Sequence, residues 1–225
     1  MAKIMGGLWF EKPAKAPEAQ PQPQPPAVIS DSITRPLGSI KLEAKERDWV
    51  VKEENRKLYA AYRFDGQTGG SGGTKTFNDA VDLQQQKPPV PASAWPTAFV
   101  FEWVSFGNNT SDCRLLGFSV IYDKASPLKH GAYTDSPGLR VNLAEDEKIV
   151  KVSLASSDRF GMIAIDFMEL RTRKSDGKVE RSYTAGLKDG KTVVDYMPFD
   201  GKTGLKGFWG ASGDAIDRMG PIWGS

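Results

Sequence analysis

The C-terminal residues Gly204–Trp223 read GLKGFWGASGDAIDRMGPIW, in which apolar segments alternate with glycines. The apolar segment Leu205–Trp209 is typical of a short strand, and Gly210–Gly213 interrupts it as glycine-rich turns between strands do. Apolar residues return in Ile216–Trp223, where Pro221 marks a bulge or an edge position. The pattern therefore predicts two strands joined by a glycine turn.

The turn between these strands carries groups that suit sugar recognition. A carboxylate is planar and only accepts hydrogen bonds, so it can accept from two neighbouring sugar hydroxyls at once. Asp217 would be this acceptor, the backbone N–H groups of Asp214 and Ala215 would donate, and Gly213 would let the backbone approach closely. Taken alone, the same stretch is more often an ordinary β-turn with an Asp solvating its tip.

The stretch GFWGASGDAIDRMGPIW resembles the closing strands of the jacalin-related lectins, whose pattern is GFxGxxGxxxDxxGxxW. The positions that match this pattern are Gly207, Phe208, Gly210, Gly213, Asp217, Gly220 and Trp223. The Gly-x-x-x-Asp element is the sugar-binding signature of that family, and it is intact at Gly213–Asp217. The resemblance implies that Asp217 accepts hydrogen bonds from a bound sugar.

A second glycine cluster, Gly69–Gly73, precedes a strand-like segment. It is not a phosphate loop, because no Gly-Lys-Ser/Thr follows it and no helix is indicated after it. The stretch GGSGGTKTFND resembles the opening GGxGGxxFDD of the same lectins, with Asn78 in place of the first acid. The resemblance implies that this loop lies beside Gly213–Asp217 and helps to close the sugar pocket. The glycines expected to shape that pocket are Gly69, Gly70 and Gly213.

Short strand-like segments fill the middle of the chain, among them Ala98–Phe106 and Leu115–Tyr122. Strands at regular spacing with turn residues between them predict an all-β sandwich or prism. The resemblance covers roughly residues 66–225 and implies a β-prism I of three antiparallel sheets with pseudo-threefold symmetry. The segment Lys148–Ala155 alternates, which predicts one face with Ile149, Lys151 and Ser153 and another with Val150, Val152 and Leu154.

The N-terminal part of the chain differs from the rest in amino-acid composition. Residues 1–27 include a proline- and glutamine-rich run and are expected to form a flexible tail. Residues 28–65 form an N-terminal extension, in which the alternation of Leu58–Phe64 favours a hairpin while Leu42–Leu58 equally allows an amphipathic helix. There is no secretory signal pattern and no apolar run near the roughly 20 residues of a membrane helix. We therefore expect a cytoplasmic or non-classically secreted protein without a membrane span.

Composition and charge argue against several other functions. The net charge is +2 with acids and bases interspersed, so no nucleic-acid partner is expected. Cys113 is the single cysteine, so an intrachain disulfide is excluded, and its predicted place is the start of a strand. His130 is the single histidine and is predicted to lie in a loop, so neither a catalytic triad nor a metal site is indicated, and no cofactor is expected.

The function implied by the resemblance is reversible, non-catalytic binding of glycans. In the galactose-preferring members of the family, cleavage turns a glycine of the opening loop into a free N-terminus, whereas here a continuous chain precedes Gly69–Gly73, which indicates mannose or glucose type. A single shallow site binds weakly, so useful avidity would require a homo-oligomer or clustered glycans. Two alternatives stay open: a β-prism that serves only as a protein-interaction module, and a glycosidase that uses Asp214 and Asp217, whose spacing allows it.

Overall fold

The computed structural model describes residues 61–105, 113–133, 138–159, 162–177, 180–188, 190–198 and 202–225. All of them belong to one unit of the chain, Arg35–Ser225. The predicted tail at residues 1–27 lies outside the described residues, and so does the predicted extension at residues 28–65 except for its last five residues.

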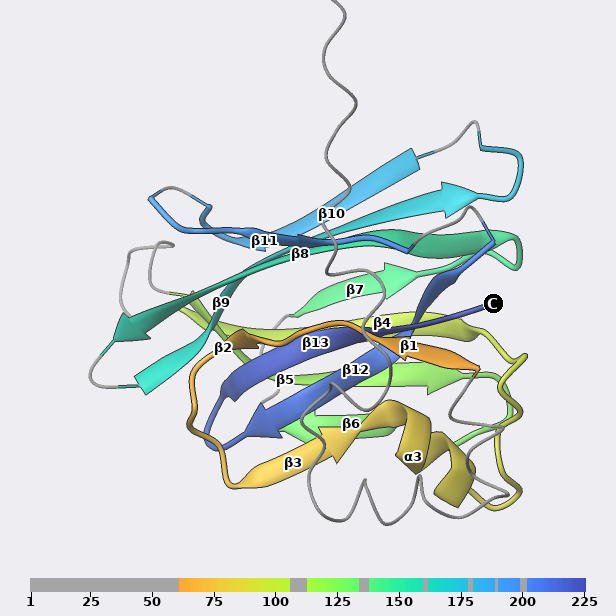
Figure 1. The fold of residues 1–225 in the computed structure, drawn as a ribbon, viewed down its shortest axis with the longest axis horizontal. Coiled ribbons are helices and arrows are strands. Elements are labelled where there is room, and N and C mark those ends of the chain that lie inside the picture. Colours follow the sequence, from red (N-terminus) through yellow and green to blue (C-terminus); the bar gives the residue numbers. More distant parts are fainter. Residues whose placement is uncertain are drawn as a thin grey trace, which may run out of the picture. The chain divides into compact units, whose positions relative to one another are not determined.

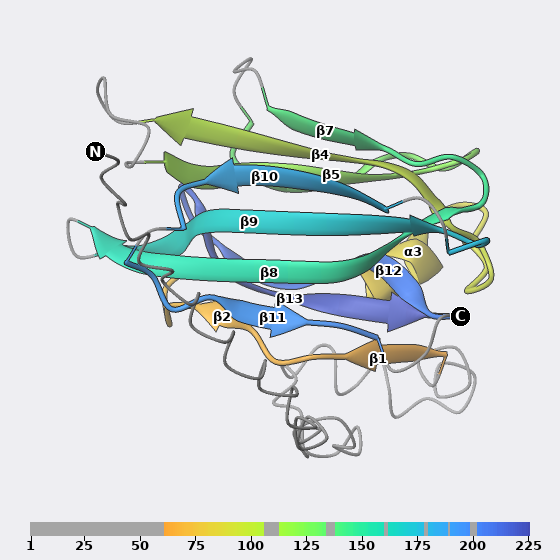
Figure 2. The ribbon, with the colours of Figure 1, turned by 90° about the horizontal axis from the view of Figure 1, so that it is seen from above.

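The described residues form three antiparallel sheets and one short helix (Figures 1 and 2). We call the sheet that contains both the earliest and the last described strands the closing sheet. Its strand order is β1-β13-β12-β3, with β2 also paired to β13. Its strands are β1 (Tyr62–Phe64), β2 (Thr68–Gly69), β3 (Lys75–Asn78), β12 (Gly204–Ser212) and β13 (Ile216–Gly224).

The other two sheets have four strands each. One has the order β6-β5-β4-β7 and consists of β4 (Pro96–Ser105), β5 (Cys113–Tyr122), β6 (Leu128–Gly131) and β7 (Leu139–Asn142). The other has the order β10-β9-β8-β11 and consists of β8 (Glu147–Arg159), β9 (Met162–Lys174), β10 (Glu180–Gly186) and β11 (Val194–Tyr196). The expected all-β prism of three antiparallel sheets is confirmed.

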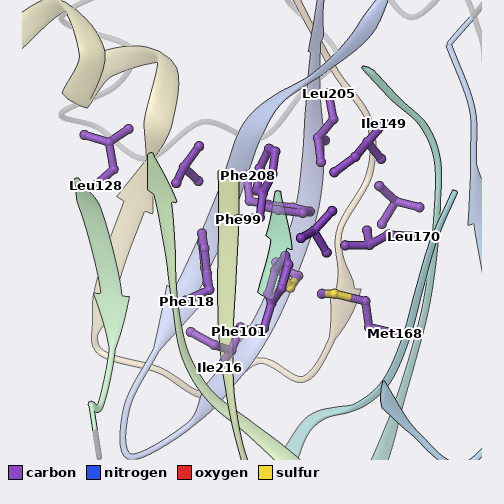
Figure 3. Close-up of a cluster of buried hydrophobic side chains, with 14 of the residues drawn as sticks. Phe99, Phe101, Phe118, Leu128, Ile149, Met168, Leu170, Leu205, Phe208 and Ile216 are labelled. Carbon is purple, nitrogen blue, oxygen red and sulfur yellow. The ribbon is translucent and has the colours of Figure 1, made fainter. Parts of the chain in front are cut away.

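The three sheets share one hydrophobic core (Figure 3). Phe208 of β12 lies at its centre, with its ring edge-on to Phe99, Phe101 and Phe118 at centroid separations of 6.1, 6.0 and 5.3 Å. Met168 and Leu170 of β9 complete the packing from the third sheet and, like Phe208, are fully buried. Each sheet thus contributes the apolar side chains of its inner face, and the three sheets together bury a core that one sheet could not bury alone.

The alternation predicted for Lys148–Ala155 is wrong on one point. Ile149 and Val152 are both fully buried, although three positions separate them and simple alternation would place them on opposite faces. The pairing of β8 with β9 shifts between Ile149 and Lys151, so Val150 is an extra residue in a β-bulge. A bulge reverses which positions point inward, because the side chains beyond it move by one residue.

The closing sheet extends further toward the N-terminus than the expected domain start at Gly66. Tyr62 pairs with Gly224 and Phe64 with Ile222, so β1 forms an edge of this sheet. Tyr62 and Phe64 are buried while Arg63 is only half-buried, as the alternation of this segment predicts. The chain therefore enters the glycine cluster from a strand that is already paired.

A short helix, α3 (Asp79–Gln85), follows the glycine cluster and β3, where the sequence indicated none. Asn78 caps it, because its side-chain oxygen accepts hydrogen bonds from the N–H groups of Ala80 and Val81 at 3.1 and 3.4 Å. Ala80, Val81 and Leu83 are buried. The helix is too short for a periodic pattern to reveal it, and only its cap and its packing stabilise it.

His130 was also misplaced by the sequence, since it belongs to strand β6 and not to a loop. Its ring stacks on Phe77 at 4.6 Å, and its Nε2 lies 2.6 Å from Oδ1 of Asp79. Burial acts to lower the pKa of His130, but the charge and the hydrogen bond of Asp79 outweigh burial, and the pKa is raised. Cys113, by contrast, begins β5 as predicted.

Candidate functional site

The pairing of β2 with β13 brings the two glycine-rich stretches together. Thr68 lies opposite Met219 and Gly69 opposite Arg218, and the N–H group of Gly70 donates to the carbonyl oxygen of Asp217 at 3.0 Å. The expectation that the first and last strands of the domain are neighbours is confirmed. The geometry therefore places the loop Gly69–Gly73 against the start of β13.

The turn between β12 and β13 presents the second half of this site. Ser212 pairs with Ile216 across it, so Gly213, Asp214 and Ala215 form the tip. The N–H group of Gly213 donates to the carbonyl oxygen of Ala215 at 2.9 Å, which tightens the turn. Gly213 and Asp214 are exposed and Ala215 is half-buried, so the tip faces solvent.

The carboxylate of Asp217 lies in a niche that glycines make possible. A Cβ atom on Gly72 would lie 2.5 Å from Oδ1 of Asp217, and one on Gly73 would lie 2.9 Å from Oδ2. Gly73 also has φ +81°, a conformation that L side chains rarely adopt. On the turn side a Cβ atom on Gly213 would lie 3.5 Å from Oδ2, an ordinary contact. The backbone of two loops thus surrounds one carboxylate at close range.

Gly69 and Gly70, the two glycines of the opening loop that the sequence assigned to the pocket, face other groups. A Cβ atom on Gly69, whose φ is +129°, would collide with the backbone oxygen of Asp217, and one on Gly70 would lie 2.6 Å from Cβ of Ile163. These two glycines let the loop approach β13 and β9. Gly72 and Gly73 face the carboxylate instead. Their role could not be read from the sequence, because the four glycines of this loop are chemically identical and only the pairing of β2 with β13 decides which of them lies next to Asp217.

The electrostatics of the niche set Asp217 apart from an ordinary surface Asp. Burial raises the pKa of Asp217, and the charge of Asp214 acts in the same direction. The N–H groups of Gly213 and Asp217 and the charge of Arg218 act to lower this pKa, without cancelling the effect of burial. Among the described residues, Oδ2 of Asp217 is shielded from solvent and has no partner at hydrogen-bonding geometry. A hydroxyl donor that reaches this oxygen would supply the hydrogen bond that it lacks.

Arg218 of β13 connects this strand to the loop Gly69–Gly73. Its Nη1 donates to the carbonyl oxygen of Gly72 at 2.6 Å. Because a Cβ atom on Gly72 would lie only 2.5 Å from Oδ1 of Asp217, this hydrogen bond holds the glycine loop close to the carboxylate. The site is thus a pre-formed arrangement of backbone around a single acidic side chain.

Comparison with known proteins identifies the class to which this arrangement belongs. A family model described as the jacalin-like lectin domain matches residues 65–222. The chain belongs to this family. The match begins after β1 and includes both glycine-rich stretches. Comparison with curated proteins gave no match.

Solved structures share the fold of this jacalin-like domain. Among them are a mannose-binding lectin from Champedak, at 20% sequence identity and a TM-score of 0.52, and frutapin from Artocarpus incisa, at 19% and 0.54. A complex of artocarpin with mannotriose aligns at 18% identity and a TM-score of 0.53. Each alignment covers 72% of this chain, and 96%, 97% and 97% of the respective lectin. At these identities the likeness shows the fold, and family membership supports non-catalytic carbohydrate binding.

The described part of the chain contains no helix long and apolar enough to cross a membrane.

Proposed function

We propose that this jacalin-like domain binds glycans reversibly through the carboxylate of Asp217, without chemical turnover. The observation that supports this is the niche itself: a carboxylate oxygen without a partner among the described residues, enclosed by the backbone of Gly72, Gly73 and Gly213. Vicinal sugar hydroxyls would donate to the two carboxylate oxygens, and a planar acceptor suits this bidentate arrangement.

The exposed turn supplies donors for the same ligand. In the proposed complex the N–H groups of Asp214 and Ala215 donate to sugar oxygens whose own protons go to Asp217. Each hydroxyl then serves as donor and acceptor at once. The sugar thereby replaces the hydrogen bonds to water that it gives up on binding. Gly213 keeps this approach open, because it is exposed and carries no side chain.

For the class of sugar we propose mannose or glucose. The loop Gly69–Gly73 continues from β2, and β1 before it is paired to β13, so amide groups and not a free α-ammonium lie beside Asp217. The neutral arrangement favours mannose or glucose, and the similar structures include a mannose-binding lectin and a complex with mannotriose.

Calorimetry on the full chain tests this proposal. Methyl α-mannoside should bind with a Kd near the millimolar range, about −4 kcal/mol, and methyl α-galactoside more weakly. Asp217→Ala should weaken binding roughly a hundredfold or more, because hydrogen bonds to a charged group contribute about 1.5–3 kcal/mol each. Asp123→Ala is the control, since Asp123 is exposed and lies outside both loops.

Three results would contradict the proposal. If the folded Asp217→Ala protein retains its affinity, the assigned acceptor is wrong. If neither calorimetry nor a glycan array shows binding by the wild type, the glycan-binding proposal fails and the alternative of a protein-interaction module is favoured. Release of a chromophore from a nitrophenyl glycoside, abolished in Asp214→Ala, would instead indicate hydrolysis.

A further inference from the structure

A second group of polar side chains lies between α3 and β6, away from the glycine loops. The helix follows the end of β3 that is farther from the β12–β13 turn, since Lys75 pairs with Ser212 near that turn and Asn78 with Trp209 (Figure 1). Here Asp79, Asp82 and His130 each offer one donor atom, and these three atoms lie within 4.8 Å of one another.

Asp79 is held in a fixed orientation. Its side chain is buried, with 1% of its surface exposed, and its Oδ2 accepts a hydrogen bond from the N–H group of Phe208 at 2.7 Å. That bond directs Oδ1 toward Nε2 of His130, at 2.6 Å. Because Gly207 has no side chain, Asp79 can approach β12 closely enough to make this contact: a Cβ atom there would lie 2.5 Å from Oδ2.

The imidazole of His130 is equally constrained. It stacks on Phe77 with a centroid separation of 4.6 Å and an interplanar angle of 24°. The ring centroid of Phe118 lies 5.0 Å from that of His130, with an interplanar angle of 49°. Only 10% of its side-chain surface is exposed. The aromatic rings therefore hold the imidazole in one orientation, with Nε2 directed at Oδ1 of Asp79.

Asp82 and a cavity complete the arrangement. Asp82 lies three residues after Asp79 on α3, which places both side chains on one face of the helix. Asp82 and His130 also line a cavity of about 360 Å³, together with Gln85, Gln86 and Lys129. The pocket is open to solvent, so water can reach Asp82 and His130 from it.

We propose that Asp79, Asp82 and His130 bind a divalent transition-metal ion, with zinc as the best match. An imidazole nitrogen with two carboxylate oxygens suits zinc, whereas calcium prefers six to eight oxygen ligands. Tetrahedral zinc at about 2.1 Å from each ligand separates the ligands by about 3.4 Å. The close pair of His130 and Asp79 therefore opens slightly on binding and Asp82 moves inward. The ion replaces the proton that Nε2 shares with Asp79, and a water from the cavity takes the fourth position.

The test uses the full chain without a histidine tag, so that the protein contains a single imidazole. Titration with zinc chloride is followed by calorimetry and by the long-range ¹H–¹⁵N NMR signals of His130. We expect one zinc ion per chain and a shift of the Nε2 resonance. Calcium chloride, titrated in the same way, should cause neither effect.

Two variants make the test specific. Asp82→Asn should weaken zinc binding at least about tenfold, the smallest loss usual even for a residue that only supports a metal ligand. Asp82→His, which restores a donor, should retain binding, and Asp123→Asn serves as the control because Asp123 is exposed and outside the cluster. An unshifted His130 signal in the wild type would show an Asp–His ion pair that binds no metal. Equal zinc affinity in the wild type and Asp82→Asn would show that Asp82 is not a ligand, and would equally overturn the proposed site. Neither outcome affects the proposed glycan site.

Discussion

Replacing Gly72 by Ala tests whether the backbone niche around Asp217 is what binds a glycan. The new Cβ atom would lie 2.5 Å from Oδ1 of Asp217, and an ordinary contact begins at 3.4 Å, so the carboxylate or the loop must move by roughly an ångström. Gly72 is not among the residues with positive φ, so the substitution adds no backbone strain. The cost to folding is therefore limited to the displacement of the exposed loop or of the Asp217 carboxylate, and the protein should still fold.

The effect on binding should be much larger than the effect on stability. Displacement of one carboxylate oxygen removes one charge-assisted hydrogen bond, about 1.5–3 kcal/mol, and so raises the Kd for methyl α-mannoside roughly 10- to 100-fold. Calorimetry measures the affinity, and thermal unfolding followed by circular dichroism checks the fold. Gly66→Ala is the matched control, since a Cβ atom on Gly66 would meet no atom within 4 Å and Gly66 has no positive φ.

The reasoning fails in one clear case. If Gly72→Ala and Gly66→Ala both bind with wild-type affinity while Asp217→Ala does not, then Asp217 binds the sugar but the glycine loop does not define its geometry. The hydrogen bond from Arg218 to Gly72 would then be too weak to hold the loop in place.

Three further predictions concern stability. Asp217→Asn should weaken glycan binding less than Asp217→Ala does, because one acceptor oxygen survives, yet it should raise the melting temperature at neutral pH. Burial raises the pKa of Asp217, so its ionised form destabilises the unliganded fold, and the gain in stability over the wild type should vanish as pH falls below about 4. Burial, with the charge of Lys148 as a smaller cause, lowers the pKa of Lys206 to about 7. Between pH 7 and 10 the unfolded chain therefore binds more protons than the folded chain, so the free energy of unfolding should rise with pH by at most about 1.4 kcal/mol per pH unit. Lys206→Met should remove this pH dependence, as measured by urea titrations at several pH values. Phe208→Ala should cost about 3–5 kcal/mol of unfolding free energy in the same assay, because Phe208 contacts three core aromatic rings; a loss below 1 kcal/mol would show that the core refills the space.

Much of the architecture is readable from the sequence because it is written in local patterns. The apolar and aromatic segments of β4, β5, β12 and β13, and the glycines between the last two, predicted strands and a turn that the structure contains. The motif around Gly213–Asp217 also identified the family correctly. Such features depend on side-chain period and turn chemistry within a few residues, so no tertiary information is needed to recognise them.

Other features depend on contacts between distant segments. The bulge at Val150 arises from the pairing of β8 with β9 and reverses the inward positions on one side of it. Helix α3 exists because Asn78 caps it and its apolar side chains are buried. His130 lies in a strand because β6 pairs with β5, although its flanking residues resemble a loop.

The sequence by itself determined that two glycine-rich stretches and one acidic residue would form the candidate glycan site. Only the tertiary structure decided that Gly72 and Gly73 face the carboxylate while Gly69 and Gly70 hold the loop, because the register of β2 on β13 sets which glycine meets which atom. In the same way, His130 meets Asp79 across 51 positions of sequence. Local patterns specify elements, but the distances between side chains of different elements follow from how the sheets pair and pack, which no single segment encodes.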